Sequence, residues 1–318
     1  MSTLSLMPTG HESVLEPELI ALLDPAPGET AVDCTFGFGG HSRALAGRIG
    51  PAGELIAIDR DPAAELRFGE VEPELASPAR FIRAEFSAAL VALAGEGVAV
   101  DVIALDLGVS SMQLDQAERG FSYSFDAPLD MRMDPTSGVS AAEAVNDWTE
   151  ARLAAVLRDF GEERHARAIA REIAARRPFT TTGELVEAIR DAVPPAYRFG
   201  RGHPAKRSFQ ALRIAVNGEL DSLARTLPIS WEILPIGGRL GVISFHSLED
   251  RPVKRFLAER SRPCICPPEL PECRCGGEPE AELLTRRAVV ATESELERNP
   301  RASSARLRVA RKLTEPRI

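Results

Sequence analysis

Short apolar runs alternate with helical patterns through the first third of the chain. Four runs are rich in aliphatic residues and end at polar or turn-forming ones: 31–35, 54–58, 79–83 and 100–107. Between them, apolar positions recur at three- and four-residue spacing, as in amphipathic helices. A similar spacing over 12–23 predicts a helix before the first run. Strands that alternate with helices form a parallel sheet through right-handed connections, so the pattern predicts an α/β fold.

A fifth apolar run, 239–245, comes only after a gap of about 130 residues, too long for a loop without structure of its own. Three amphipathic stripes fill this gap. They consist of Leu153, Val156, Leu157, Phe160, Ile169 and Ile173; Leu185, Val186, Ile189 and Val193; and Leu212, Val216, Leu220, Leu223 and Leu227. We interpret the gap as an all-helical domain inserted into the sheet domain. The predicted division is 1–114 and 216–318 for the sheet domain and 115–215 for the insertion.

The pattern in the last third of the chain predicts the strands that complete the sheet. A helix is expected from Phe245 to about Glu259, followed by a loop rich in Cys and Pro. Two β-like runs come next, 286–291 and 305–312, separated by a turn at Asn299-Pro300. Their length and separation predict an antiparallel pair that closes the sheet.

A glycine-rich turn follows the first predicted strand. The segment Ala31–Ser42 passes from an apolar run through Asp33 to three glycines in four residues, and a helical pattern then opens. That order places backbone amides and a helix N-terminus against a nucleotide. Asp59 ends the second strand about twenty residues later, where a carboxylate accepts hydrogen bonds from ribose hydroxyls.

Two residues indicate which nucleotide the turn holds. The dinucleotide pattern requires a third glycine at position 42, where this chain has Ser42. Asp33 precedes the glycines, and its carboxylate would repel a pyrophosphate but attract an ammonium or sulfonium group. We therefore favour S-adenosylmethionine, which is cationic and carries no phosphate. Phe86, just after the third strand, is placed to pack on an adenine, although an ordinary core position is the alternative.

Composition places the chain among globular cytosolic proteins. It has 318 residues, of which 44% are hydrophobic and 27% charged, and no apolar run approaches the length of a membrane helix. The first ten residues do not resemble a signal peptide, and five cysteines, mostly in one cluster, fit a reducing compartment. We therefore expect a cytoplasmic protein.

The net charge of −9 opposes non-specific binding to nucleic acid, but the charge is uneven. The segment 164–213 carries eleven Arg or Lys against four acids, and 286–317 carries nine against four. These two basic segments are candidate contact surfaces, with solvated helix faces as the alternative.

Eight stretches together resemble a known family. They are His11–Leu15, Thr35–Ser42, Asp106–Ser111, Arg119–Ser122, Pro128–Met133, Phe209–Asn217, Ser244–Arg251 and Asn299–Ala302. In this order they resemble the RsmH (MraW) family of 16S ribosomal RNA cytosine-N4 methyltransferases. One departure is Met112, where the family has a proline after the serine pair.

The resemblance implies a fold, a reaction and a set of contacts. It implies a class I S-adenosylmethionine-dependent methyltransferase, with a doubly wound, mostly parallel seven-stranded sheet and a substrate-recognition insertion. The implied reaction is N4-methylation of cytidine 1402 of 16S ribosomal RNA in the small ribosomal subunit. The implied cofactor contacts are Gly39, Gly40, His41, Asp59, Phe86, Asp106 and Gln113, to which the charge argument adds Asp33.

Asp106 is our candidate catalytic residue. The exocyclic amine of cytosine is a weak nucleophile, so the site must orient it and relieve its developing charge. Asp106 ends the fourth strand beside the glycine turn, where a carboxylate can accept an N–H. Its motif lacks the aromatic that amino-methyltransferases often carry here, so the stacking ring must come from elsewhere. Phe121, Tyr123 and Phe125 are candidates, each also compatible with simple packing.

His246 follows the fifth strand on the same carboxyl edge of the sheet. It is a candidate for substrate contact or proton transfer, and capping of the next helix with Ser247 and Glu249 is the equal alternative. Asp130, Arg132 and Asp134 either line the pocket mouth or form an ion-pair network that serves only their loop.

Two further clusters complete the candidates. Arg201, Lys206 and Arg207 surround the start of a helix and are candidate phosphate contacts, which suits an insertion that presents one unstacked base. Four cysteines form two pairs with a single residue inside each pair, which is atypical of zinc: Cys264, Cys266, Cys273 and Cys275. We therefore expect no metal and keep zinc as the alternative.

Two other functions stay open at this point. One is a methyltransferase of another RNA base or of a small amine. The other is a ribosome assembly factor that keeps the cofactor fold without catalysis. The presence of Asp33, Asp59 and Asp106 disfavours the second.

Overall fold

The computed structural model describes residues 12–200, 202–264, 266 and 277–315. The chain divides into two compact units. The sheet unit comprises the residues up to Gly108 and those from Ser222 onwards, and the helical unit comprises Val109–Asp221. The bounds of the helical unit lie within a few residues of the 115–215 segment expected from the sequence, and its role in substrate recognition stays a prediction.

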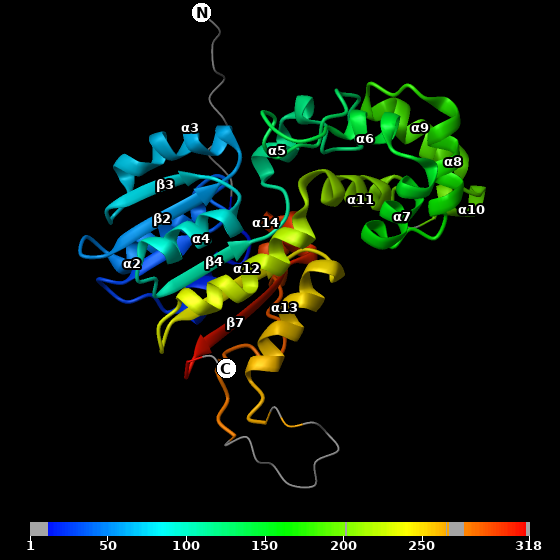
Figure 1. Ribbon diagram of the computed structural model, residues 1–318. Helices are drawn as coiled ribbons and strands as arrows, with labels where there is room; N and C mark the ends of the chain where they lie inside the picture. Colours follow the sequence, from blue (N-terminus) through cyan, green and yellow to red (C-terminus); the bar gives the residue numbers. More distant parts are fainter. Residues whose placement is uncertain (1–11, 201, 265, 267–276, 316–318) are drawn as a thin grey trace, which may run out of the picture. The chain divides into compact units, whose positions relative to one another are not determined.

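The sheet unit is built on seven strands, in the order β3-β2-β1-β4-β5-β7-β6. The strands are β1 Thr30–Asp33, β2 Glu54–Asp59, β3 Ala79–Arg83, β4 Val102–Asp106, β5 Arg239–Ser244, β6 Ala281–Leu283 and β7 Arg306–Lys312. The first five run parallel, whereas β7 is antiparallel to both β5 and β6 (Figure 1). This mostly parallel, doubly wound sheet confirms the predicted fold class.

Helices cover both faces of this sheet, because the strands are apolar on both sides. The helices of this unit are α1 Glu16–Leu23, α2 Gly40–Ile49, α3 Pro62–Val71, α4 Phe86–Glu96, α12 Glu219–Ile233, α13 Ser247–Arg260 and α14 Glu293–Arg298, with short 3₁₀ turns at Glu72–Glu74 and Pro300–Ser304. Alternate strand residues enter different cores. Ala31 packs in the core with α1 and α2, and Val32 packs in the core with α4 and α12.

The helical unit has an apolar core of its own. Its helices are α5 Ser111–Asp115, α6 Ala141–Asp147, α7 Glu150–Gly161, α8 Ala166–Arg176, α9 Thr182–Ala192, α10 Pro195–Arg198 and α11 Lys206–Asn217, with a 3₁₀ turn at Ala117–Arg119. Residues of the predicted stripes fill this core, among them Leu153, Ile169, Leu185 and Leu212. Within the described residues of both units, no helix is long and apolar enough to cross a membrane.

Two of the predicted stripes are interrupted. The stripe over 152–173 consists of two helices, since the chain turns at Glu162, which adopts a left-handed φ of 48°. The stripe over 212–227 also breaks, at Gly218 with φ 62°, so that Leu212 belongs to the helical core and Leu223 to the sheet core. Apolar periodicity continues through a one-residue cap of this kind, so spacing alone does not reveal it.

The predicted strand over 286–291 is wrong. The strand beside β7 is β6, and 286–291 contributes only an isolated bridge from Val289 to Leu307. The amides of Leu284 and Thr285 both donate to the carbonyl of Val309, which interrupts the ladder between the two contacts. The partner strand β7 lies where it was predicted, as does β3, whose bounds match the predicted ones.

Candidate active site

Three carboxylates gather at the carboxyl ends of three adjacent strands. Asp33 ends β1, Asp59 ends β2 and Asp106 ends β4, and these strands are neighbours in the order β2-β1-β4. The glycine turn follows Asp33 and leads into α2. The strand order explains this grouping, because neighbouring parallel strands bring their carboxyl ends to one edge of the sheet.

The glycine turn has no room for side chains. Gly39 has φ 82°, and a Cβ atom there would lie 2.7 Å from the ring of Phe36. A Cβ atom at Gly40 would lie 1.8 Å from the hydroxyl oxygen of Ser13. The amide of Gly37 donates to Asp59 Oδ2 at 2.9 Å, which ties the turn to the end of β2. The backbone of the turn is thus held in place and bare, as close approach of a ligand requires.

Asp33 is an internal brace of the turn. Its side chain is buried, with 1% of the residue exposed. Its Oδ2 accepts the hydroxyl of Ser42 at 2.6 Å, and its Oδ1 accepts the amide of Thr35 at 3.1 Å. These bonds explain the serine at position 42, because a glycine could not donate this bond. A direct contact between Asp33 and a cofactor stays a prediction.

Asp59 holds the turn and still has acceptor capacity. Its Oδ1 accepts the amide of Asp61 at 2.9 Å, in addition to the bond from Gly37. Burial raises the pKa of Asp59 to about 6, with the neighbouring charges of Asp61 and Asp33 adding to the rise. Each carboxylate oxygen accepts more than one hydrogen bond, so ribose hydroxyls remain compatible with this site. Phe86 opens α4 and packs, half-buried, against the sheet core.

Asp106 carries a buried polar atom that the described residues leave unsatisfied. Its amide donates to Thr35 Oγ1 at 2.7 Å, and its Oδ2 lies 3.8 Å from His41 Nδ1. Its Oδ1 is buried and has no hydrogen-bond partner within the described part of the chain. Burial raises the pKa of Asp106 to about 7, the nearby His41 opposes this, and the charges of Asp33 and Glu249 add to it. A buried acceptor without a partner is costly, which points to an external donor.

His41 connects Asp106 to the N-terminal segment. It lies in the first turn of α2, is buried, and its Nε2 is 3.0 Å from the carbonyl of Val14. Because a carbonyl only accepts, Nε2 carries a proton, and the other ring nitrogen, Nδ1, faces Asp106. His41 is therefore positioned to orient the Asp106 carboxylate and to lower its pKa.

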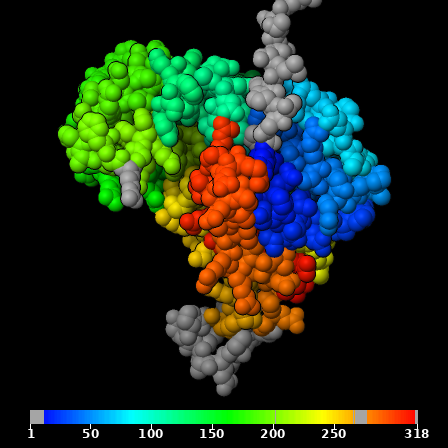
Figure 2. All heavy atoms as spheres, turned by 180° about the vertical axis from the view of Figure 1, so that it is seen from behind, coloured from blue at the N-terminus to red at the C-terminus, as the bar shows by residue number. Residues whose placement is uncertain are grey.

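Residues 295–299 bond to the N-terminal segment Glu12–Leu15, an arrangement that we call the clasp. Glu295 of α14 is buried, and its Oε1 accepts the amide of Leu15 at 2.8 Å. Arg298 pairs with Glu12 at 2.9 Å, and the Asn299 side chain donates to the carbonyl of Glu12 at 3.0 Å. Figure 2 shows the two chain ends of this unit side by side, blue beside orange-red. Sequence reasoning missed this clasp, although both segments belong to the motifs that carried the resemblance.

His246 lies at the N-cap of α13. Its Nε2 is 3.1 Å from Glu249 Oε1, and Glu249 Oε2 accepts the amides of Phe245 and His246 at 2.8 and 3.3 Å. This is the capping arrangement foreseen as the alternative for His246. Contact with substrate stays a prediction for this residue.

The helical unit places the remaining candidates. Gln113 is buried, and its Oε1 accepts the amide of Ser110 at 3.0 Å in the capping box of α5. Phe121 is buried in the helical core, and Tyr123 stacks on the ring of His203 with centroids 4.6 Å apart. Phe125 has 61% of its surface exposed. Of the three aromatics, Phe125 is thus the one whose ring is free to meet a base.

The basic motif before α11 is only partly described. Lys206 and Arg207 are exposed in the first turn of α11, and Arg201 lies outside the described residues. Cys264 and Cys266 are described, but Cys273 and Cys275 are not, so the zinc alternative lies outside what the structure describes. No described residues group three or more His, Cys, Asp or Glu side chains into a metal site.

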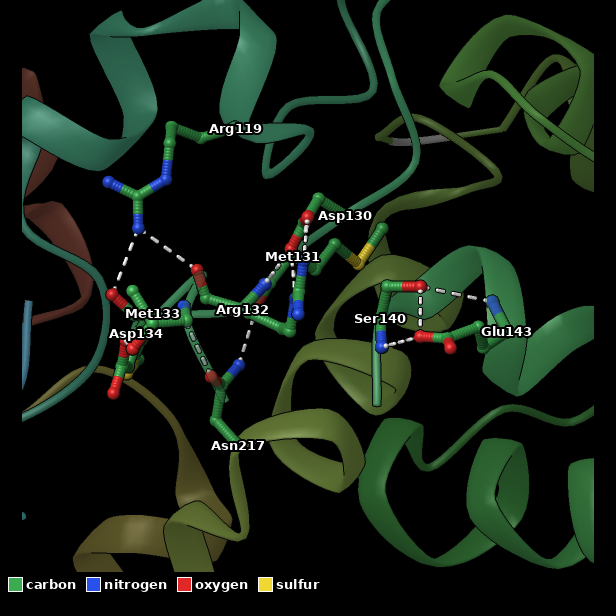
Figure 3. Close-up of polar contacts among 10 residues, drawn as sticks. Arg119, Asp130, Met131, Arg132, Met133, Asp134, Ser140, Glu143 and Asn217 are labelled. Carbon is green, nitrogen blue, oxygen red and sulfur yellow. Dashed lines mark hydrogen bonds and ion pairs between the residues drawn. The ribbon is translucent and has the colours of Figure 1, made fainter. Parts of the chain in front are cut away.

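Asp130, Arg132 and Asp134 belong to a loop braced by its own side chains (Figure 3). Arg132 pairs with both oxygens of Asp130 at 2.8 and 2.7 Å, while Asp134 accepts the amide and hydroxyl of Thr136. Arg119 Nη2 donates to the carbonyls of Arg132 and Met133, at 2.9 Å each. This local network is the alternative foreseen from the sequence.

The side chain of Asn217 fixes the same loop from α11. Its Oδ1 accepts the amide of Met133 at 2.7 Å, and its Nδ2 donates to the carbonyl of Met131 at 2.8 Å (Figure 3). Met131 has a left-handed φ of 61°, a conformation rare for a side chain of this size. Because Asn217 fixes both the carbonyl of Met131 and the amide two residues later, it supports that conformation.

Comparison with known proteins matches this chain along almost its whole length. The model of the MraW methylase family matches residues 8–313. A ribosomal RNA small subunit methyltransferase H of Heliobacterium modesticaldum is 48% identical over 308 residues, which is 95% of this chain and 98% of that protein. The protein of that name from Syntrophotalea carbinolica is 49% identical over 307 residues, and covers 95% of this chain and 98% of its own. On these grounds, and in agreement with the motifs around the glycine turn, the chain belongs to the MraW methylase family.

Proposed function

We propose that this protein transfers a methyl group from S-adenosylmethionine to N4 of cytidine 1402 of 16S ribosomal RNA, in the small ribosomal subunit. Methylation of small-subunit ribosomal RNA is the activity that its relatives' names give, and S-adenosylmethionine is the methyl donor of this family and fold class. The choice of base and atom is our proposal. A cytoplasmic location accompanies a ribosomal substrate and stays a prediction.

The observation that carries the proposal is the buried, unpartnered Oδ1 of Asp106 among the described residues. It lies at the end of β4, beside the glycine turn, where an incoming amino group would meet it. An exocyclic amine brings an N–H donor to this acceptor, whereas a ring carbon brings none. An amine on a nucleobase therefore suits this atom.

The residues of the site fit the expected cofactor. The bare backbone at Gly39 and Gly40 allows close approach, Asp59 keeps lone pairs for ribose hydroxyls, and we expect Phe86 to pack on the adenine. The carboxylates of Asp33, Asp59 and Asp106 favour a cation over a phosphate. When bound, S-adenosylmethionine would supply an electrophilic methyl group on a sulfonium.

The chain's own residues do the remaining work. Asp106 accepts an N4–H of cytosine, which holds the amine in one orientation and relieves positive charge as the new bond forms. A pKa of about 7 lets its carboxyl be ionised in a large fraction of molecules at neutral pH. His41 lies at 3.8 Å and stabilises the ionised form electrostatically. Positioning supplies much of the rate of an in-line methyl transfer, so these fixed side chains matter more than acid–base strength alone.

Labelled methyl transfer tests this function. Small subunits from cells that lack the protein are incubated with purified protein and labelled S-adenosylmethionine, and the modified nucleoside is then identified. We expect N4-methylcytidine at a single position. Label on another base would support a different RNA methyltransferase, and binding without transfer would support the non-catalytic assembly factor.

A further inference from the structure

A pocket of about 930 Å³ lies between α7 and α8, within the helical unit. Arginine side chains line it: Arg158 of α7, Arg164 just before α8, and Arg167 and Arg171 on α8. Arg167 and Arg171 are four residues apart and share one helix face. Alanines supply much of the remaining wall, so the floor of the pocket is small and apolar.

Three of these arginines lack internal partners. Arg164, Arg167 and Arg171 are exposed, and their guanidinium groups form no ion pair or hydrogen bond within the described part of the chain. Arg176 of the same helix behaves differently, because it pairs with both Glu172 and Asp191. The cations that face the pocket are therefore the ones left for an external anion.

The acids near the pocket do not neutralise it. Glu163 is buried and accepts the Tyr197 hydroxyl at 2.8 Å and the amide of His165 at 2.9 Å. Glu150 is the other acid in the lining, on the first turn of α7. Arg158 pairs with Asp159 at 2.7 Å. The lining thus keeps a surplus of positive charge on a chain whose net charge is −9.

One cation of the basic motif joins this surface. Arg207 donates to the carbonyl of Glu162 at 2.6 Å, in the turn between α7 and α8. The charges of Arg164 and Arg207 both act on the pKa of Tyr197, so the two guanidinium groups lie near the same hydroxyl. The positive surface therefore continues from the pocket to the start of α11.

We propose that this pocket binds the sugar–phosphate backbone of ribosomal RNA, through Arg164, Arg167 and Arg171. The inference rests on the proposed function, and it assigns a specific contact surface for the RNA within the helical unit. Guanidinium groups match phosphate oxygens bidentately, and three cations on one surface suit successive phosphates. The alanine floor admits a ribose or an unstacked base between them.

Binding measurements on charge-matched variants test this site. One variant combines Arg164→Gln, Arg167→Gln and Arg171→Gln. The control combines Arg48→Gln, Lys254→Gln and Arg255→Gln, which removes the same charge at exposed positions outside the pocket and outside both basic segments. A third variant changes the three pocket arginines to lysine. Each is titrated onto protein-free 16S ribosomal RNA and onto small subunits from cells that lack the protein, at several salt concentrations.

We expect the pocket variant alone to lose salt-dependent affinity. Three phosphate contacts on single-stranded RNA contribute about 2 to the slope of log K against log salt, which corresponds to on the order of 100-fold in affinity at 0.1 M salt relative to 1 M. The methylation KM should rise in parallel with unchanged kcat, and the lysine variant should keep most of the slope. Unchanged melting temperatures check that the variants fold.

Three results would separate the possibilities. An unchanged slope in the pocket variant, or an equal change in the control, would overturn the assignment. Weakened binding to small subunits with normal binding to protein-free RNA would identify a ribosomal protein as the ligand, which also overturns it. If the wild-type protein methylated some other atom while the pocket variant still lost RNA affinity, the proposed N4 chemistry would fall and the RNA site would stand.

Discussion

Replacing Asp106 by asparagine should lower activity and raise stability at the same time. The change keeps the shape of the side chain but removes its charge and the acceptor capacity of one oxygen. Positioned proton acceptors contribute about 10²- to 10⁴-fold to rate, so kcat for methyl transfer should fall by about that factor. Wild-type kcat/KM should rise as pH increases through about 7, where Asp106 ionises, and this rise should be absent from the residual activity of the variant.

The stability effect follows from the raised pKa of the same carboxyl. Burial moves this pKa from 3.8 to about 7 in the folded protein. Below pH 3.8 both states are protonated and the carboxyl has no effect on the free energy of unfolding. Between pH 3.8 and about 7 the unfolded chain releases its proton first, so stability falls as pH rises. Above pH 7 the loss is constant, at most about 4 kcal/mol for a difference of about three pKa units.

Asparagine is neutral at every pH, so the variant does not undergo this loss in the free energy of unfolding. The melting temperature of Asp106→Asn should therefore exceed that of the wild type at pH 8 by several degrees, at about 2–4 °C per kcal/mol, and the difference should shrink towards pH 4. Calorimetry at both pH values measures this. Asp101→Asn is the matched control, since Asp101 lies just before β4 at its opposite end and accepts the Thr30 amide at 2.9 Å. A variant that is fully active, or that melts below the wild type at pH 8, would refute the reasoning.

Three smaller predictions concern the supports of the site. Gly39→Ala should weaken cofactor binding measured by calorimetry, because residue 39 has φ 82° and its Cβ would lie 2.7 Å from the Phe36 ring; binding within twofold of wild type would contradict this. Glu295→Ala should weaken cofactor binding and lower stability by about 1–3 kcal/mol in urea unfolding, since it leaves the buried Leu15 amide without an acceptor. Asn217→Ala should cost about 2–4 kcal/mol by the same measurement, and a cost below 1 kcal/mol would show that the loop holds without it.

The sheet and its acids could be predicted because both follow from local pattern. Buried parallel strands are apolar runs of predictable length, and parallel strands bring their carboxyl ends to one edge, which places Asp33, Asp59 and Asp106 together. The breaks at Glu162 and Gly218 escaped prediction, because a left-handed cap of one residue leaves the apolar spacing intact.

The supports of the site depend on contacts that no local pattern encodes. Nothing in the spacing relates Glu295 to Leu15, which are 280 positions apart. The serine at position 42 was noticed only as a missing glycine, whereas the structure shows it bonded to Asp33. The unpartnered state of Arg167 and Arg171 is also tertiary, since it depends on which acids α9 presents to α8.

Because of the clasp between α14 and the N-terminal segment, the glycine turn is made before the residues that support it. The glycine turn is synthesised well before Glu295, Arg298 and Asn299, which bond to the segment that contacts His41. A nascent chain that ends before these residues has the turn without its support. The glycine turn therefore gains this support only after the residues of α14 and Asn299 have been synthesised.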